Sequence, residues 1–227
     1  MNVRKNEQGN IALAAVAVVV GLVVGFAVAS VSKSDTNNNK TASSTPAGGT
    51  SQKASDLRAD LVTLGVDHMT LTQSAVAQTL DGSKGAEAAA AALYANGNDI
   101  GAKVGSVYGA DAEKTFDSVW KLHLDQFVAY AGAASKGDEA GKKAALDTID
   151  SQYTKPLSAF LAKANPNLPE KTLNTVLSDH VQMTAAMIDD HVAGKYADEQ
   201  AALKQANEHM ATIMSTLAGG IAKQKNL

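Results

Sequence analysis

Three copies of one sequence unit follow each other along the chain, and this repeat limits the possible folds more than any other feature. Its landmarks are His68, His123 and His180, which follow one another at nearly equal spacing. In every copy a glycine follows the histidine at the same offset, and large apolar side chains precede it at two fixed offsets. These positions are Gly82, Gly137 and Gly194; Leu61, Phe116 and Leu173; and Leu64, Val119 and Val176. Apolar residues at such intervals indicate helices on both sides of a glycine turn, so each copy is predicted to be an αα-hairpin.

The predicted fold is therefore an all-α bundle of six helices in three hairpins. The hairpins cover about 57–110, 111–167 and 168–225, and the helices are expected at 57–81, 84–107, 111–135, 138–163, 169–193 and 196–222. Asp111 is a plausible N-cap, and Pro169 suits the first turn of a helix. Short connections make successive helices antiparallel neighbours, which leaves either an up-and-down bundle or two four-helix-like halves sharing the middle hairpin.

Residues 1–31 read as a membrane segment. The 21 residues from Ile11 to Val31 carry no charge and follow Arg4 and Lys5. At about 1.5 Å per residue they are long enough to cross a hydrocarbon core of about 30 Å. The positive-inside rule then predicts a single-pass protein in the cell membrane with its C-terminal part outside the cytoplasm. Ala27-Val28-Ala29 also fits a signal-peptidase site, in which case the protein is secreted.

Two further features of the N-terminal part are a small-residue pattern in the membrane segment and a polar stretch after it. Small residues recur every four positions at Ala17, Gly21, Gly25 and Ala29, the spacing of helix pairs in membranes, so a homodimer through this segment is one expectation. Residues 32–56 are rich in Ser, Thr, Asn and Gly and are predicted to be a disordered linker. The folded part is expected at 57–227.

The charge balance excludes nucleic acid as a partner. The chain has 20 basic and 23 acidic side chains, and only Arg4 and Arg58 are arginines. Nucleic-acid binders carry a basic face and use the arginine fork. An acidic folded part is also unsuited to lying on anionic lipid, so contact with the membrane is expected only through the N-terminal helix.

The repeated histidines are predicted to face the core and to form a polar layer with residues of the partner helices. One interpretation is structural, with each imidazole satisfied by a single polar partner. The other is a metal site, for which the third copy is richest in donors. The candidate ligands are His180, His209, Met183, Met187, Met210 and Met214, together with His68 and His123. Thioethers mixed with imidazoles suit copper, especially Cu(I), and the chain has no cysteine to compete.

Enzymatic chemistry has no recognisable motif in the sequence. It lacks a Gly-x-Ser-x-Gly elbow, a His-Glu-x-x-His zinc motif, a phosphate-binding loop and a dinucleotide fingerprint. Four aromatic residues on one predicted helix are expected to be core packing: Phe116, Trp120, Phe127 and Tyr130. No catalytic residue and no bound organic cofactor are predicted.

Residues 105–130 read GSVYGADAEKTFDSVWKLHLDQFVAY, and ANPNLP at 164–169 and EHM at 208–210 accompany them. This pattern resembles a poorly characterised family of secreted bacterial helical proteins, often found in surface proteins with a copper amine oxidase N-terminal-like domain. The resemblance covers about residues 57–225 and implies a secreted helical bundle. It implies no oxidase activity, because the chain lacks the Asn-Tyr-Asp or Asn-Tyr-Glu site of the quinone cofactor.

The sequence thus favours a non-enzymatic, membrane-tethered bundle that serves as an interaction or cell-envelope module for an unknown protein partner at the cell surface. The alternative function is copper binding through the histidine and methionine layer.

Overall fold

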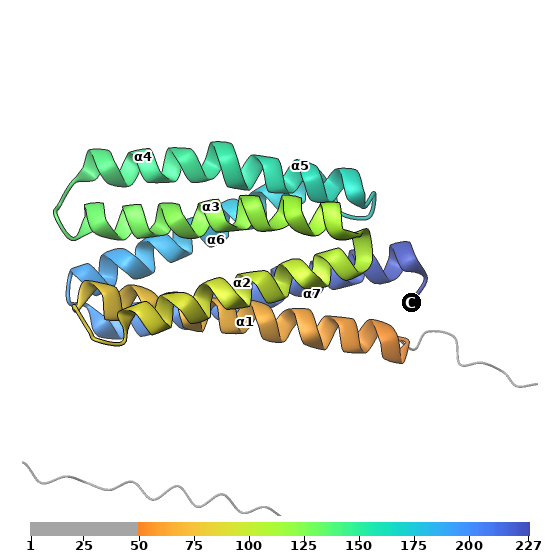
Figure 1. Cartoon of the computed structure of the whole chain (residues 1–227), viewed down its shortest axis with the longest axis horizontal. Coiled ribbons are helices and arrows are strands. Elements are labelled where there is room, and N and C mark those ends of the chain that lie inside the picture. Colours follow the sequence, from red (N-terminus) through yellow and green to blue (C-terminus); the bar gives the residue numbers. More distant parts are fainter. Residues whose placement is uncertain (1–49) are drawn as a thin grey trace, which may run out of the picture. The chain divides into compact units, whose positions relative to one another are not determined.

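A computed structural model describes residues 50–227, and all regular structure in this range is helical (Figure 1). The elements in chain order are α1 (Gln52–Leu80), α2 (Ala86–Tyr108), α3 (Ala110–Ala134), α4 (Glu139–Ile149), η1 (Asp150–Thr154), α5 (Lys155–Ala164), α6 (Glu170–Val192) and α7 (Tyr196–Lys225). The all-α prediction is confirmed for this range. The membrane segment predicted at 1–31, with its dimer motif, and residues 32–49 of the predicted linker lie outside the described residues.

In each of the three hairpins, one Schellman turn joins the two helices. The repeated glycine forms this turn, as predicted. Gly82, Gly137 and Gly194 have φ angles of +64°, +65° and +69°. In each turn the glycine N–H and the next N–H donate to carbonyls of the preceding helix; Gly137, for example, donates to Ala134 at 3.0 Å. A left-handed residue at this place satisfies the last carbonyls without a Cβ clash, so the glycine ends the helix and reverses the chain.

Two predicted helix starts are wrong. α1 begins at Gln52, ahead of the expected start at residue 57, so the end of the predicted linker is helical. The Ser51 hydroxyl accepts a hydrogen bond from the Ala54 N–H at 3.2 Å and caps this helix. α3 begins at Ala110 after Gly109, which has a φ angle of +93°, so Asp111 lies inside the first turn and is not the N-cap.

The fourth predicted helix, 138–163, is interrupted at its middle. A short π-helical segment, η1, separates α4 from α5, although the three run on as one rod in Figure 1. A π-segment accommodates one extra residue and rotates the side chains that follow. The two last residues of η1, Tyr153 and Thr154, are completely buried.

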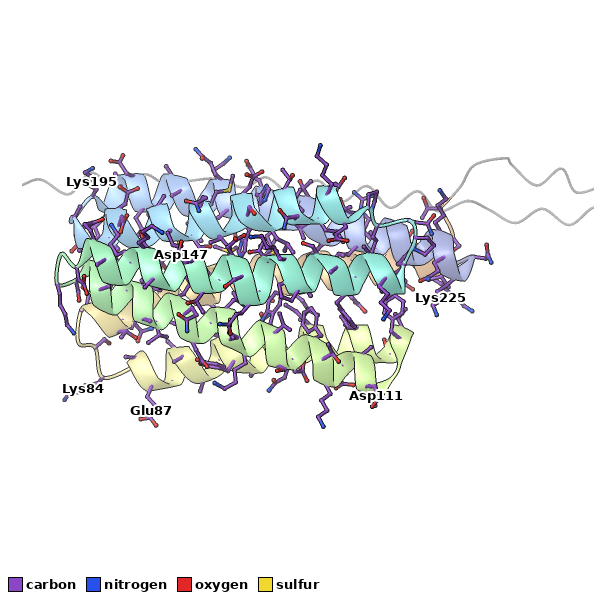
Figure 2. All side chains as sticks on the ribbon, turned by 90° about the horizontal axis from the view of Figure 1, so that it is seen from above. Lys84, Glu87, Asp111, Asp147, Lys195 and Lys225 are labelled. Carbon is purple, nitrogen blue, oxygen red and sulfur yellow. The ribbon has the colours of Figure 1, made fainter. Side chains whose placement is uncertain are left out.

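The helices close into a ring around a common core. Each helix packs against the next along the chain, and α7 packs against α1, which closes the ring. The first helices of the three hairpins, α1, α3 and α6, also contact one another across the interior. The arrangement is an up-and-down bundle, with the charged side chains labelled in Figure 2 on its outside.

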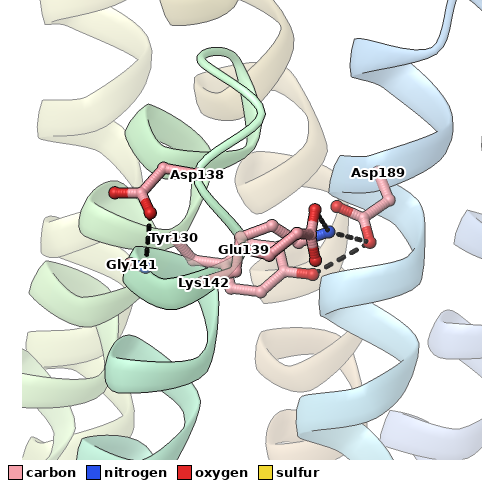
Figure 3. Close-up of polar contacts among 6 residues, drawn as sticks. All are labelled: Tyr130, Asp138, Glu139, Gly141, Lys142 and Asp189. Atoms are coloured by element: carbon pink, nitrogen blue, oxygen red, sulfur yellow. Dashed lines mark hydrogen bonds and ion pairs between the residues drawn. The ribbon is translucent and has the colours of Figure 1, made fainter.

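A hydrogen bond and an ion pair connect hairpin two to hairpin three (Figure 3). The Tyr130 hydroxyl of α3 donates to the Asp189 carboxylate of α6 at 2.9 Å, and the Lys142 ammonium of α4 lies 3.1 Å from the same carboxylate. Burial, followed by this hydrogen bond, raises the pKa of Tyr130 to about 12. The phenol therefore stays neutral at any ordinary pH and remains a donor to Asp189.

Candidate metal centre

Three histidines meet at the centre of the bundle, one from each hairpin. His68 lies on α1, His123 on α3 and His180 on α6, and their exposed fractions are 1%, 0% and 1%. One ring nitrogen from each lies within 4.8 Å of the corresponding nitrogens of the other two. We call these residues the histidine triad. The prediction that the repeated histidines face the core is confirmed.

The repeat explains why the three side chains converge. Each histidine occupies the same position of its helix relative to the flanking apolar residues, and the three helices contact one another in the interior. The helix turn after His68 and after His180 carries a buried threonine, whose hydroxyl donates back to the histidine carbonyl at 2.7 and 2.9 Å. These threonine hydroxyls are therefore satisfied by the backbone and do not approach the imidazoles as partners.

Aromatic rings surround the triad. The Trp120 ring centroid lies 4.7 Å from that of His123 and 4.9 Å from that of His68. Tyr153 of the π-segment stacks on His123 at 4.2 Å, with an interplanar angle of 22°. The shell carries no charge, and burial in it makes a charged imidazole costly at this place.

The imidazoles are neutral at ordinary pH and largely without hydrogen-bond partners. Burial lowers the pKa of His68 to about 4 and that of His180 to about 3, and it holds the pKa of His123 well below the usual value. Both ring nitrogens of His123 and His180, and Nδ1 of His68, are buried with no partner among the described residues. Hydrogen bonding acts weakly on two of the rings: the Asn96 side chain raises the pKa of His68 and the Trp120 backbone raises that of His123, each against the larger effect of burial. The prediction of one polar partner per histidine is not met for His180.

Three neutral imidazoles are a recognised ligand set for transition metals. Bonds of about 2.0–2.1 Å in tetrahedral geometry place nitrogens about 3.4 Å apart. The triad nitrogens, within 4.8 Å of one another, reach that spacing by side-chain rotations that move each nitrogen by less than about 1 Å. No carboxylate belongs to the group within residues 50–227.

The other predicted ligands of hairpin three lie in different settings. His209 is half-buried and its Nε2 lies 2.9 Å from the Val176 carbonyl oxygen, so it has its own partner. Met210 and Met214 are buried in the core beside Gly65 of α1. Met187 is buried as well, whereas Met183 is partly buried and packs against the core. All four methionines thus occupy positions typical of core packing.

His191, which shares a helix with His180, belongs to a separate polar cluster at one end of the bundle. Its Nδ1 lies 3.0 Å from the Glu199 carboxylate and its Nε2 lies 3.4 Å from that of Asp81. Gln73 donates to the other Glu199 oxygen at 2.7 Å. The cluster joins α1, α6 and α7, so it connects the first hairpin to the third.

Sequence reasoning placed the site mainly in hairpin three, while the structure forms the triad from one residue of each hairpin. The signal for the triad was present, because the three histidines have the same phase in three copies of one unit. The partner helix of hairpin two places Tyr153 against His123. The π-segment that carries Tyr153 had no signal in the sequence. The four aromatic residues of α3 are all buried, as predicted.

Among the helices of residues 50–227, none combines the length and apolar content needed to cross a bilayer. No protein family, curated protein or solved structure matches the chain. The resemblance to secreted helical proteins therefore stays a prediction, and the site is interpreted from its own geometry.

Proposed function

We propose that the protein is a metal-binding helical bundle whose ligands are His68, His123 and His180. The observation that supports this most directly is the set of five buried ring nitrogens without a partner. Buried polar atoms in folded proteins are almost always hydrogen-bonded, and a group of exceptions at one point needs an explanation. A metal ion held by one nitrogen from each ring accounts for three of the five, because each neutral imidazole has one lone pair to give.

We propose Cu(I) as the ion. The cost of burying an ion rises with the square of its charge, and neither the triad nor its aromatic shell offers a negative charge to offset it. A monovalent ion is therefore favoured over Zn(II) or Cu(II). Copper was also the metal of the alternative function predicted from the sequence, although the ligands proposed here are three imidazoles and not a mixed histidine and methionine layer.

In this proposal the predicted segment 1–31 holds the bundle outside the cytoplasm. The protein then binds or passes on metal at the cell surface, without catalysis. A protein partner there stays a prediction, as does the homodimer through the N-terminal segment.

The test is metal binding by the purified full chain in detergent. Cu(I), Cu(II) and Zn(II) are added separately, the excess is removed, and bound metal is measured by elemental analysis. We expect one Cu(I) per chain. At 100 times its dissociation constant the ion should add about 2.7 kcal/mol to the free energy of unfolding.

The matched variants are His123→Leu and His209→Gln. His123→Leu removes one ligand and two unpaired buried nitrogens at similar volume. It should therefore abolish the copper-dependent stabilisation and raise the free energy of unfolding of the metal-free chain by about 1–3 kcal/mol. His209→Gln should bind copper like the unmodified chain. Equal copper binding by the unmodified chain and the His123→Leu variant would contradict the proposal.

A further inference from the structure

The bundle contains an apolar cavity whose lining includes Trp120 and Tyr153, two rings of the shell around the histidine triad. Its volume is about 40 Å³, and residues of all three hairpins line it. Leu61, Leu177 and Met214 are among them, and each is at most 5% exposed. The cavity belongs to the core and is distinct from the shallow surface depressions between neighbouring helices.

Four polar side chains line this cavity: Lys103 and Tyr108 have hydrogen-bond partners, whereas the Tyr153 hydroxyl and the Trp120 Nε1 have none among the described residues. The Lys103 ammonium pairs with Asp60 at 2.6 Å. The Tyr108 hydroxyl is bonded to the Gln224 and Asn165 side chains at 3.0 and 3.1 Å. All other lining side chains are leucine, isoleucine, valine, methionine or phenylalanine. Cavities with such a lining take up small apolar molecules.

Two aromatic residues connect the cavity to the triad. Trp120 and Tyr153 both line the cavity, and both rings contact His123. The Tyr153 hydroxyl is buried with no partner among the described residues. A molecule in the cavity thus lies next to the rings that pack on the proposed metal ligands.

We infer that the cavity is a binding site for one apolar molecule of the size of dioxygen or carbon monoxide. Three imidazoles leave a fourth position of a tetrahedral ion free. The ligand class of the metal centre is then a neutral diatomic gas supplied from the cavity. The binding site in the cavity does not depend on the metal, whereas the assignment of a diatomic gas as the metal's ligand rests on the proposed function.

The first experiment tests the cavity in the metal-free full chain. Dissolved xenon is titrated and backbone amide shifts are followed by NMR. We expect saturable shifts at Leu61, Leu177 and Met214, and their loss in the variant Leu161→Phe, which fills the cavity. Ile213→Phe fills it from α7 and serves if the first variant does not fold. Leu203→Phe, at a partly buried position that does not line the cavity, is the control and should keep the shifts. Absence of saturable shifts, or shifts unchanged by filling the cavity, would overturn the inference.

The second experiment tests the ligand at the metal. Carbon monoxide is added to the Cu(I)-loaded chain and its infrared C–O stretching band is recorded. We expect one bound carbon monoxide per copper. The Leu161→Phe variant should retain copper and lose this band. Bound copper without such a band overturns the ligand assignment and leaves the metal proposal intact. If no copper is retained, the metal proposal and the ligand assignment both fail, and the xenon titration still decides the cavity.

Discussion

At the scale of single residues, the triad histidines lower the stability of the metal-free fold. A buried polar group without a partner costs about 1–3 kcal/mol, and five such nitrogens lie at one place. Leucine or phenylalanine at these positions would pack without this cost. The presence of histidine in all three copies of the repeat is therefore better explained by a ligand than by packing.

The lowered pKa values predict how the metal-free protein responds to acid. The unfolded chain takes up protons on these histidines below about pH 6.5, whereas the folded chain holds His68 neutral to about pH 4 and His180 to about pH 3. The unfolded state thus binds more protons in this window, and stability falls as pH falls from about 6.5 towards 4. The charged groups that further lower the pKa of His123 and His180 are all imidazoles, those of the triad and of His209.

Urea unfolding of the metal-free chain between pH 7.5 and pH 4 measures the slope of the free energy of unfolding against pH. In the triple variant His68→Leu, His123→Leu, His180→Leu the part of the slope above pH 5 should largely disappear, because carboxylates titrate mainly below that pH. The same slope in both proteins would show that the triad is already protonated in the folded state.

At the scale of elements, α2 depends on α3 for its position. Gly97, Gly101 and Gly105 lie one turn apart on α2, and a Cβ atom at any of them would overlap side chains of α3. At Gly97 it would lie 2.7 Å from the Trp120 ring, which packs on the triad. Glycine costs about 1 kcal/mol in a helix relative to alanine, and the close approach of α3 accounts for its use here.

Alanine substitutions at two glycines should therefore have opposite effects. Gly97→Ala forces Trp120 to move and should lower the free energy of unfolding by about 1–3 kcal/mol. Gly132→Ala in α3 meets no atom within 4 Å and should raise it by about 1 kcal/mol, the propensity difference. Thermal and urea unfolding of the two variants give the comparison, and stabilisation by Gly97→Ala would contradict the close packing of α2 on α3.

At the scale of the bundle formed by residues 50–227, the ring is closed where hairpin three meets hairpin one. α7 packs along α1, and the cluster of Asp81, His191 and Glu199 joins the two hairpins at one end. His191 and Glu199 are 6% and 2% exposed. Removing one member of a buried pair leaves the other without compensation, whereas replacing both by apolar residues restores packing.

His191→Leu should accordingly lower the free energy of unfolding by about 3 kcal/mol, because the Glu199 carboxylate then stays buried with Gln73 as its remaining partner. The double variant His191→Leu, Glu199→Leu should recover most of that loss. Hydrogen exchange at the C-terminal end of α1 reports on the closure itself and should speed up only in the single variant. Additive losses in the double variant would show that the pair does not couple the hairpins.

The sequence by itself determined the local structure of residues 50–227: helices, their turns and the inward phase of each repeated histidine. The reason is that apolar spacing and the glycine φ preference act within a few residues and need no distant partner. The start of α1 at Gln52 was missed, since the polar composition of residues 52–56 outweighed the signal of Ser51 as a cap.

The tertiary structure decided which of these residues meet. Hairpin three alone holds more donors than the triad, yet its His191 and His209 find other partners, and the site forms from one histidine of each hairpin. The π-segment that brings Tyr153 against His123 also depends on packing. Closure of the helices into a ring places α1, α3 and α6 around one interior point, and no spacing along the chain specifies that contact between helices of separate repeats.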